Sequence, residues 1–239
     1  KREYYTPEMA RRMGLSSHHE RCLTCPEKDR CSFYMDLSQG ENRRLYLEQE
    51  HHDGYFRDQC VFRPEIDIED NMNVLVGYDN GVNLTYSLNA FNAWEGYTMA
   101  FNGTKGRLEH RVVEQIYVSG TDTVQGAIMP RGVTTRIIPM RGEAREIEPW
   151  TGVGSHGGGD SAMLDDVFLT NPPADTYERN ADERAGACSI LIGVAANRCF
   201  ETGQPVRIAD LVTGLGRPGF APMPSRSAPL PMPQAPQGA

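Results

Sequence analysis

The chain has 239 residues, a formal net charge of -8 and an isoelectric point near 5.3. This acidic balance argues against a nucleic-acid partner or an anionic membrane surface, because both need basic side chains. No apolar run approaches the roughly 18 residues of a membrane span, and the first residues lack the apolar core of a signal peptide. We therefore expect a soluble, cytoplasmic chain that forms one large domain or two small ones.

Residues 1–63 are polar, rich in cysteine and histidine, and without clear periodicity. We expect this segment to be irregular and to be fixed by something other than a large apolar core. Its Cys22 and Cys25 form a C-x2-C pair, a spacing that presents two thiolates to one tetrahedral metal ion. Cys31 and Cys60 are the natural remaining ligands. The histidines of the segment are alternative ligands: His18, His19, His51 and His52.

The cysteine pattern therefore predicts a structural zinc site, or an iron–sulfur site, at Cys22, Cys25, Cys31 and Cys60. Reduced thiols or an adventitious disulfide remain the alternative. A framework of disulfides is not expected, because a chain of this length does not need one and no export signal is visible.

Residues 64–214 are predicted to form an α+β domain. From residue 64 to about 150, apolar and polar residues alternate as in half-buried strands. Asn80-Gly81 lies between two apolar-rich runs and predicts a hairpin in which both turn residues have positive φ. Further strands are expected on either side of a turn at Gly103–Gly106, and within residues 133–140 and 144–150. Such a succession predicts an open, mostly antiparallel sheet that helices cover on one face.

Two helices are expected to supply this cover. Asp160 is predicted to be the N-cap of the first, and the second is expected from about Asp182 to Thr202, ended by Gly203. The apolar side of each helix is expected to be buried, namely Met163, Leu164, Val167 and Phe168 in the first and Ala187, Ile190, Leu191, Val194 and Ala195 in the second.

Residues 215–239 are predicted to be an extended, mostly disordered tail. Seven of the 23 residues from 217 to 239 are proline, which excludes a helix or an internal strand. Binding of a partner by this tail is the alternative interpretation.

The glycine-rich segment GSHGGGDSAMLDDVF, residues 154–168, is the most distinctive candidate for a functional site. Its three consecutive glycines allow the backbone to pass close to a ligand or to another domain, and His156 and Asp160 flank them. A dinucleotide-binding loop is not predicted, because no G-x-G-x-x-G segment is expected to follow a strand and open a helix. Since other catalytic motifs are also missing, spacing alone identifies no complete catalytic apparatus.

Three stretches of the sequence resemble the C-terminal half of the Gfo/Idh/MocA oxidoreductases, in the order found in that family. They are residues 66–109, 155–168 and 190–211, and the resemblance extends over about residues 45–212. FNGTKGRLE, residues 101–109, and ETGQPVRIADL, residues 201–211, are its most specific parts. The resemblance implies an α/β domain with an open sheet, which supplies part of a sugar pocket on one face and often an oligomer interface on the other.

The resemblance further implies an NAD- or NADP-binding Rossmann domain, in cis or in trans, and a sugar or polyol substrate that is oxidised or reduced at a hydroxyl group. The family's dinucleotide fingerprint, its Glu-Lys-Pro lysine and its catalytic Asp/His pair belong upstream of residue 1. The chain is therefore expected to be a fragment that is inactive alone, with a natural split protein as the less economical explanation. A cofactor-dependent sugar lyase or glycosidase, and a non-catalytic metal-pinned module for oligomerisation or carbohydrate binding, remain alternatives.

The resemblance also places the segment around His156 near the sugar pocket. His156 is then a candidate to bond a hydroxyl and to assist proton transfer, and Asp160 is a candidate substrate ligand. Alternatively, His156 only ties down a loop and Asp160 only caps a helix. Trp94 and Tyr97 are candidate substrate ligands because flat rings stack on sugars, although aromatic residues beside a strand are also typical of a core.

Overall fold

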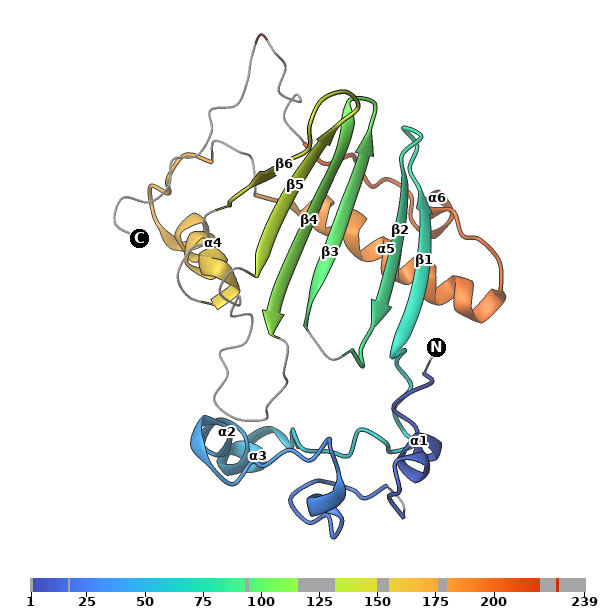
Figure 1. The fold of residues 1–239 in the computed structure, drawn as a ribbon, viewed down its shortest axis with the longest axis vertical. Coiled ribbons are helices and arrows are strands. Elements are labelled where there is room, and N and C mark those ends of the chain that lie inside the picture. The colour runs from blue at the N-terminus through green and yellow to red at the C-terminus, as the bar shows by residue number, and fades with distance from the viewer. Residues whose placement is uncertain are drawn as a thin grey trace. The chain divides into compact units, whose positions relative to one another are not determined.

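The computed structural model describes residues 2–16, 18–92, 95–115, 132–149, 155–175, 180–219 and 227. The chain divides into two compact units, Lys1–Asn73 with Ser87–Leu164 and Val74–Tyr86 with Asp165–Ala239. Short helices come first, two open antiparallel sheets follow, and the two longest helices and one short helix come last among the described elements (Figure 1). The predicted α+β class with open antiparallel sheets is thus confirmed. None of the described helices is long and apolar enough to span a membrane.

The N-terminal segment, residues 2–70, is built from single turns of helix around a small apolar cluster. Ala10, Leu15 and Phe62 are buried at its centre. Phe33 packs edge to face on Phe62, with 5.4 Å between ring centroids. The helical turns are α1 (Pro7–Arg12), η1 (Lys28–Arg30), α2 (Gly40–Leu45), η2 (Leu47–Gln49) and α3 (Glu50–Asp53).

A buried ion-pair network joins distant parts of this segment. The Arg21 guanidinium lies 2.8 Å from a carboxylate oxygen of Asp58 and donates to Glu50 at 3.1 Å. Asp58 is only 1% exposed, and it also accepts a hydrogen bond from the Leu23 backbone N–H at 2.8 Å. Because its carboxylate is paired and hydrogen-bonded, the cost of burying that charge is offset.

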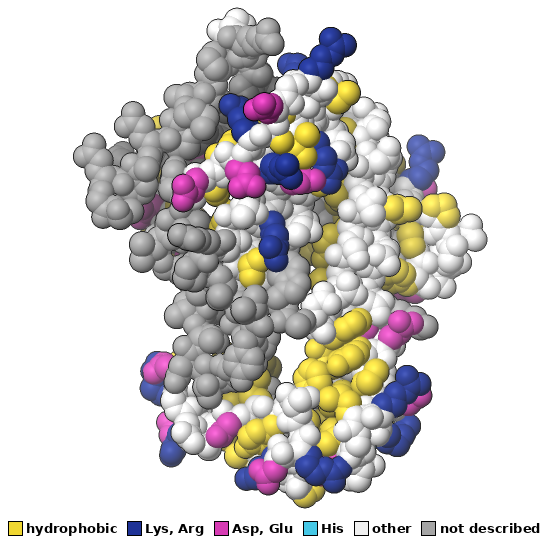
Figure 2. Space-filling view, in the orientation of Figure 1, with side chains coloured by type: hydrophobic (Ala, Val, Ile, Leu, Met, Phe, Trp, Pro, Cys, Tyr) yellow, Lys and Arg dark blue, Asp and Glu magenta, His cyan; other side chains and the backbone are white. Residues whose placement is uncertain are grey.

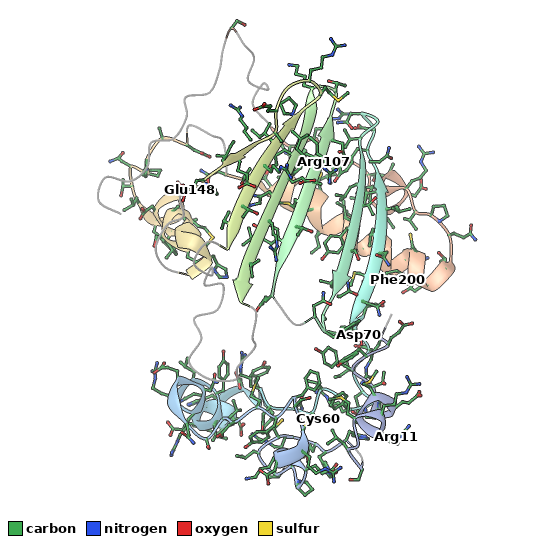
Figure 3. The ribbon with its side chains drawn as sticks, in the orientation of Figure 1. Arg11, Cys60, Asp70, Arg107, Glu148 and Phe200 are labelled. Atoms are coloured by element: carbon green, nitrogen blue, oxygen red, sulfur yellow. The ribbon has the colours of Figure 1, made fainter. Side chains whose placement is uncertain are left out.

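A second buried carboxylate, Asp70, anchors the start of the chain (Figure 3). It accepts hydrogen bonds from the backbone N–H groups of Glu3, Tyr4 and Tyr5 at 2.6–3.0 Å. Burial raises the pKa of Asp70, but these three backbone donors outweigh burial, so the pKa is lowered. The ionised carboxylate therefore stabilises this contact.

The first two strands, β1 (Asn71–Gly77) and β2 (Asn83–Asn89), form a hairpin of their own. The predicted turn at Asn80-Gly81 is confirmed, since the Gly81 N–H donates to the Tyr78 carbonyl at 3.0 Å. The expectation that both turn residues have positive φ is wrong, because Gly81 has φ 85° and Asn80 does not share that conformation. A three-residue loop of this kind needs only its last residue in the left-handed region.

The other four strands form a separate antiparallel meander. It comprises β3 (Glu95–Gly103), β4 (Gly106–Gln115), β5 (Val133–Pro139) and β6 (Arg145–Ile147), hydrogen-bonded in that order. The strands predicted within residues 133–140 and 144–150 are confirmed. The strands form two sheets, and not the one continuous sheet that we expected.

The turn between β3 and β4 needs glycine at position 106. Gly106 has φ 153°, and a Cβ atom there would lie 2.4 Å from the Ile138 carbonyl oxygen of the adjacent strand. This close backbone approach explains a glycine in the FNGTKGRLE stretch without reference to a ligand.

The later helices are α4 (Gly159–Phe168), α5 (Glu183–Thr202) and α6 (Ile208–Leu211). The predicted ends of α5 are confirmed, because the Asp182 side chain accepts from the Ala185 N–H and Gly203 ends the helix with φ 67°. The predicted burial of the apolar side is wrong for α4, where Met163, Leu164, Val167 and Phe168 are all exposed. In α5, Ile190 and Val194 are exposed, whereas Ala187 and Leu191 are half-buried and Ala195 is buried. The predicted tail, residues 215–239, lies mainly outside the described residues.

Candidate functional site

The segment from Ser155 to Asp160 brings an imidazole and a carboxylate together. A 3-10 turn, η3 (Ser155–Gly158), leads directly into α4. The His156 Nδ1 atom lies 3.0 and 2.9 Å from the two carboxylate oxygens of Asp160, one helical turn further along. With Nδ1 engaged by Asp160, the other ring nitrogen, Nε2, is the one that is available to a ligand. Both side chains are substantially exposed, at 63% for His156 and 45% for Asp160.

The charges around this pair favour the protonated imidazole. The hydrogen bond and the negative charge of Asp160 raise the pKa of His156, and the charge of Glu114 near the end of β4 acts in the same direction. The fold thus brings Glu114 towards the pair. No local pattern in the sequence links Glu114 to the glycine-rich segment, so its position could not be predicted from the sequence.

The backbone of this segment is unusual. His156 has φ 52°, which only a minority of non-glycine residues adopt, and Gly158 has φ 84°. A Cβ atom at Gly159 would meet no atom of the described residues within 4 Å. The conformation at Gly158 accounts for one glycine of the run by itself.

The prediction that Asp160 is the N-cap of α4 is wrong. The helix begins at Gly159, so Asp160 is its second residue, and its carboxylate contacts the imidazole of His156. A negative charge in the first turn still suits the helix dipole. Asp160 therefore pairs with the histidine four residues earlier and does not cap the helix.

Of the two aromatic candidates, Tyr97 is among the described residues and Trp94 lies outside them. Tyr97, in β3, is 45% exposed, and its ring centroid lies 6.1 Å from that of His110 on β4. No hydrogen bond or ring contact joins Tyr97 to His156 or Asp160 among the described residues. The structure therefore brings His156 and Asp160 together, but not Tyr97 with them.

A groove of about 330 Å³ lies along β3, β4 and β5. Arg107, Glu109 and Arg111 alternate along β4 and line it. Arg107 is held in place by Glu109 at 2.7 Å and by the side chain of Asn102 at 2.8 Å. Acidic and basic side chains are interspersed over the upper part of the view in Figure 2. Such groups bond hydroxyls, and the RLEHR pattern at residues 107–111 was a signal that our sequence analysis did not use.

Comparison with known proteins identifies the domain. The model of the "Oxidoreductase family, C-terminal alpha/beta domain" of the Gfo/Idh/MocA proteins matches residues 26–208. The chain belongs to the Gfo/Idh/MocA oxidoreductase family. It is also 31% identical over 204 residues to "Putative oxidoreductase YteT" of Bacillus subtilis (strain 168), an alignment that covers 80% of this chain and 45% of that protein. No solved structure matches the chain significantly.

Membership of the Gfo/Idh/MocA family confirms the resemblance seen in the sequence and implies a nucleotide cofactor in general. The chain spans less than half of the length of the relative from Bacillus subtilis.

Residues 152–157, Gly-Val-Gly-Ser-His-Gly, do have the G-x-G-x-x-G spacing that our sequence analysis did not recognise, and β6 precedes them and α4 follows. The surrounding structure differs from that of a dinucleotide site, because β6 is an antiparallel strand whereas the fingerprint requires a parallel βαβ unit. Part of this stretch lies outside the described residues. Within the described part of the chain, the strands form no parallel pair and so offer no such unit for the nucleotide.

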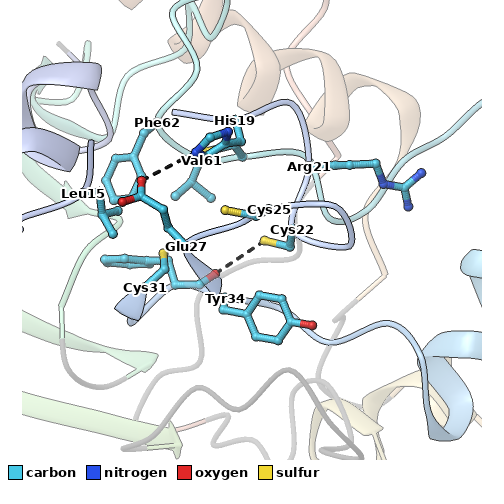
Figure 4. Close-up of a pocket in the computed structure, with 12 residues that line it drawn as sticks. Leu15, His19, Arg21, Cys22, Cys25, Glu27, Cys31, Tyr34, Val61 and Phe62 are labelled. Atoms are coloured by element: carbon cyan, nitrogen blue, oxygen red, sulfur yellow. Dashed lines mark hydrogen bonds and ion pairs between the residues drawn. The ribbon is translucent and has the colours of Figure 1, made fainter. Parts of the chain in front are cut away.

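The four cysteines predicted to bind metal line a single cavity of about 30 Å³ (Figure 4). His19 lines the same cavity, whereas the other candidate histidines, His18, His51 and His52, do not. All four thiols are free of disulfides. Burial raises the pKa of Cys22 and of Cys31, which favours their neutral thiol form in the metal-free chain. As they stand, no three His, Cys, Asp or Glu side chains among the described residues are grouped so that they could hold a metal ion.

Proposed function

We propose that this chain is the substrate-binding and assembly half of an NAD- or NADP-dependent oxidoreductase that acts on a hydroxyl group of a sugar or polyol. The observation that carries this proposal is the exposed imidazole of His156, held by Asp160 through Nδ1. Family membership supports the oxidoreductase class and the need for a nucleotide cofactor.

In this proposal, His156 is the group that exchanges a proton with the substrate hydroxyl through Nε2. Oxidation of a hydroxyl-bearing carbon requires that the hydroxyl proton leaves, and an imidazole near neutral pH accepts and returns such a proton. Asp160 is a positioning residue that fixes the ring and stabilises the imidazolium that forms. The nucleotide, when bound, supplies the acceptor or donor of the hydride.

The groove along β3–β5 and the aromatic residues are proposed to recognise the remaining hydroxyls and ring faces of the substrate. Arg107 and Glu109 present a guanidinium and a carboxylate, which together donate to and accept from hydroxyl groups. Tyr97 and Trp94 are proposed from sequence to stack on the substrate. The exposed ring of Tyr97 lies on the face of the sheet that carries Met99 and Phe101, which is opposite to the face of Arg107 and Glu109.

The nucleotide is proposed to be held mainly by a Rossmann domain that joins this chain in cis or in trans. The antiparallel setting of the described strands supports this division, because a dinucleotide site needs a parallel βαβ unit. Assembly through the sheet is supported by Met99 and Phe101 of β3, which are 42% and 59% exposed on one face.

The same exposed face favours one alternative function, a non-catalytic module for oligomerisation or carbohydrate binding. That alternative predicts self-association or sugar binding that is insensitive to changes at His156. It also predicts no hydride transfer when a family Rossmann domain is supplied.

The test is the turnover of this chain joined to a Rossmann domain of the family. We expect His156→Ala to lower kcat by about 100-fold or more, the range for loss of a general acid–base group. The melting temperature should hardly change, because His156 is exposed. His52→Ala, at an exposed histidine of α3, is the matched control and should leave both quantities unchanged.

Asp160→Asn provides a second readout. Because Asp160 raises the pKa of His156, its removal should shift the limb of the pH–rate profile that reports His156 to lower pH. Equal loss of activity and stability in His156→Ala, or an unchanged profile in Asp160→Asn, would contradict the proposed roles.

A further inference from the structure

The N-terminal segment holds four cysteine side chains that the proposed oxidoreductase function does not use. Two of them are placed by an isolated antiparallel bridge between Arg21 and Gln59. The Cys22 N–H donates to the Asp58 carbonyl at 2.8 Å, and the Cys60 N–H donates to the Glu20 carbonyl at 3.0 Å. Cys22 and Cys60 each follow one bridge residue, so their side chains lie on the same face of the bridge as diagonal neighbours.

The other two cysteines are fixed by turns. The Cys25 N–H donates to the Cys22 carbonyl at 3.0 Å, so the C-x2-C pair closes a turn. Cys31 follows the η1 turn, and its N–H donates to the Glu27 carbonyl at 3.1 Å. Backbone hydrogen bonds therefore bring all four side chains to one cavity (Figure 4).

The size and lining of this cavity suit a single ion. Its volume of about 30 Å³ is enough for a group of the size of one water molecule or one ion. Four sulfur donors are the ligands of a tetrahedral structural zinc site. In the metal-free chain no three of these sulfurs are grouped so that they could hold an ion, so binding requires rotation about the single side-chain torsion of each cysteine.

The buried apolar core of this segment is small. Its buried members are Ala10, Leu15 and Phe62, and seven half-buried residues pack against them, namely Tyr5, Met9, Met13, Cys31, Phe33, Cys60 and Val61. Small units of this kind are typically stabilised by a metal ion or by disulfides, and none of these cysteines forms a disulfide.

We propose that Cys22, Cys25, Cys31 and Cys60 bind one zinc ion as thiolates, and that this ion holds the N-terminal segment together. His19 also lines the cavity, and its buried Nε2 atom lies 3.5 Å from the Glu27 carboxylate without a hydrogen-bond partner among the described residues. The four sulfurs complete a tetrahedral shell without His19. This inference stands on the cysteine geometry alone and is independent of the proposed oxidoreductase function.

The first test is the metal content of the protein purified under reducing conditions without chelators. We expect about one zinc per chain, and Cys25→Ser should lose it together with stability. Cys188→Ser changes a half-buried cysteine of α5 outside the cavity, so it should keep the zinc content of the parent chain.

Because Cys25→Ser is expected to unfold the segment, a second measurement uses the unchanged sequence. The protein is freed of metal under reducing conditions and titrated with Co²⁺ alone. Four-sulfur coordination predicts a saturable sulfur-to-cobalt charge-transfer band with tetrahedral d–d bands, both abolished by added zinc. Retention of zinc by His19→Ala is expected as well.

Three results would overturn the proposal. The first is metal-free protein whose four thiols react readily while the fold and its stability are unchanged. The second is Co²⁺ binding without a sulfur charge-transfer band. The third is iron with acid-labile sulfide in place of zinc.

Discussion

Asp58 in the N-terminal segment is 1% exposed and lies 2.8 Å from the Arg21 guanidinium, whereas Arg107 and Glu109 in the sheet pair at 2.7 Å with 40% and 41% of their side chains exposed. The two ion pairs have similar lengths, but the first involves a buried carboxylate and the second is exposed to solvent. In the N-terminal segment, charged groups are buried and join parts of the chain that are distant in sequence. In the sheet β3–β6, the backbone ladder joins the strands, and the charged side chains line an open groove.

This difference separates residues that hold the fold from residues that meet a ligand. A buried, paired charge is costly to leave unpaired, so its loss is felt in stability. An exposed pair on a strand contributes little to stability and is accessible to a substrate. We therefore expect changes in the N-terminal segment to unfold it, and changes in the groove to affect binding.

The largest expected effect is that of Arg21→Ala. It leaves the buried Asp58 carboxylate without its cation, which should lower the free energy of unfolding by about 3–5 kcal/mol. Arg107→Ala in the sheet is the matched control and should cost about 0–1 kcal/mol. Urea denaturation of both variants measures the difference. Equal losses of unfolding free energy would contradict the proposed distinction between the two regions.

A smaller effect is expected for Asp70→Asn, which weakens three hydrogen bonds from backbone N–H groups and should cost about 1–3 kcal/mol at neutral pH. The pKa of Asp70 is lowered in the folded chain. Its contribution to stability is therefore present above the pKa of the unfolded state and is lost as the pH falls through the lower folded pKa.

Unfolding free energies measured from neutral to acidic pH test this predicted loss of stability on acidification. The parent chain should lose stability in that acidic window more steeply than Asp70→Asn does. Asp210→Asn, at an exposed aspartate of α6, should follow the parent chain. Parallel pH profiles for the parent and Asp70→Asn would show that this carboxylate does not anchor the N-terminal residues.

Local features of the fold could be predicted from the sequence because a few neighbouring residues determine them. Asn80-Gly81 marked the hairpin, Asp182 and Gly203 marked the ends of α5, and the glycines of FNGTKGRLE marked the β3–β4 turn. The four cysteines of the predicted metal site line one cavity, although as they stand they are not grouped so that they could hold a metal ion.

Contacts between distant residues could not be predicted in this way. Nothing near Arg21 indicates that Asp58 is its partner, and nothing near His156 indicates Glu114. Apolar periodicity predicted helices α4 and α5, but periodicity does not say what covers their apolar sides. That of α4 is exposed, and that of α5 is only partly buried. The local sequence allows Asp160 either to cap a helix or to pair with His156, and in the structure it pairs with His156.

The most direct test of the proposed division of labour is a titration of this chain alone with NADH, followed by the fluorescence of the cofactor. We predict no saturable binding by this chain, and binding once a Rossmann domain of the family is joined to it or added. Saturable binding by this chain without that domain would contradict the account, because the nucleotide site would then lie within the residues assigned here to substrate and assembly.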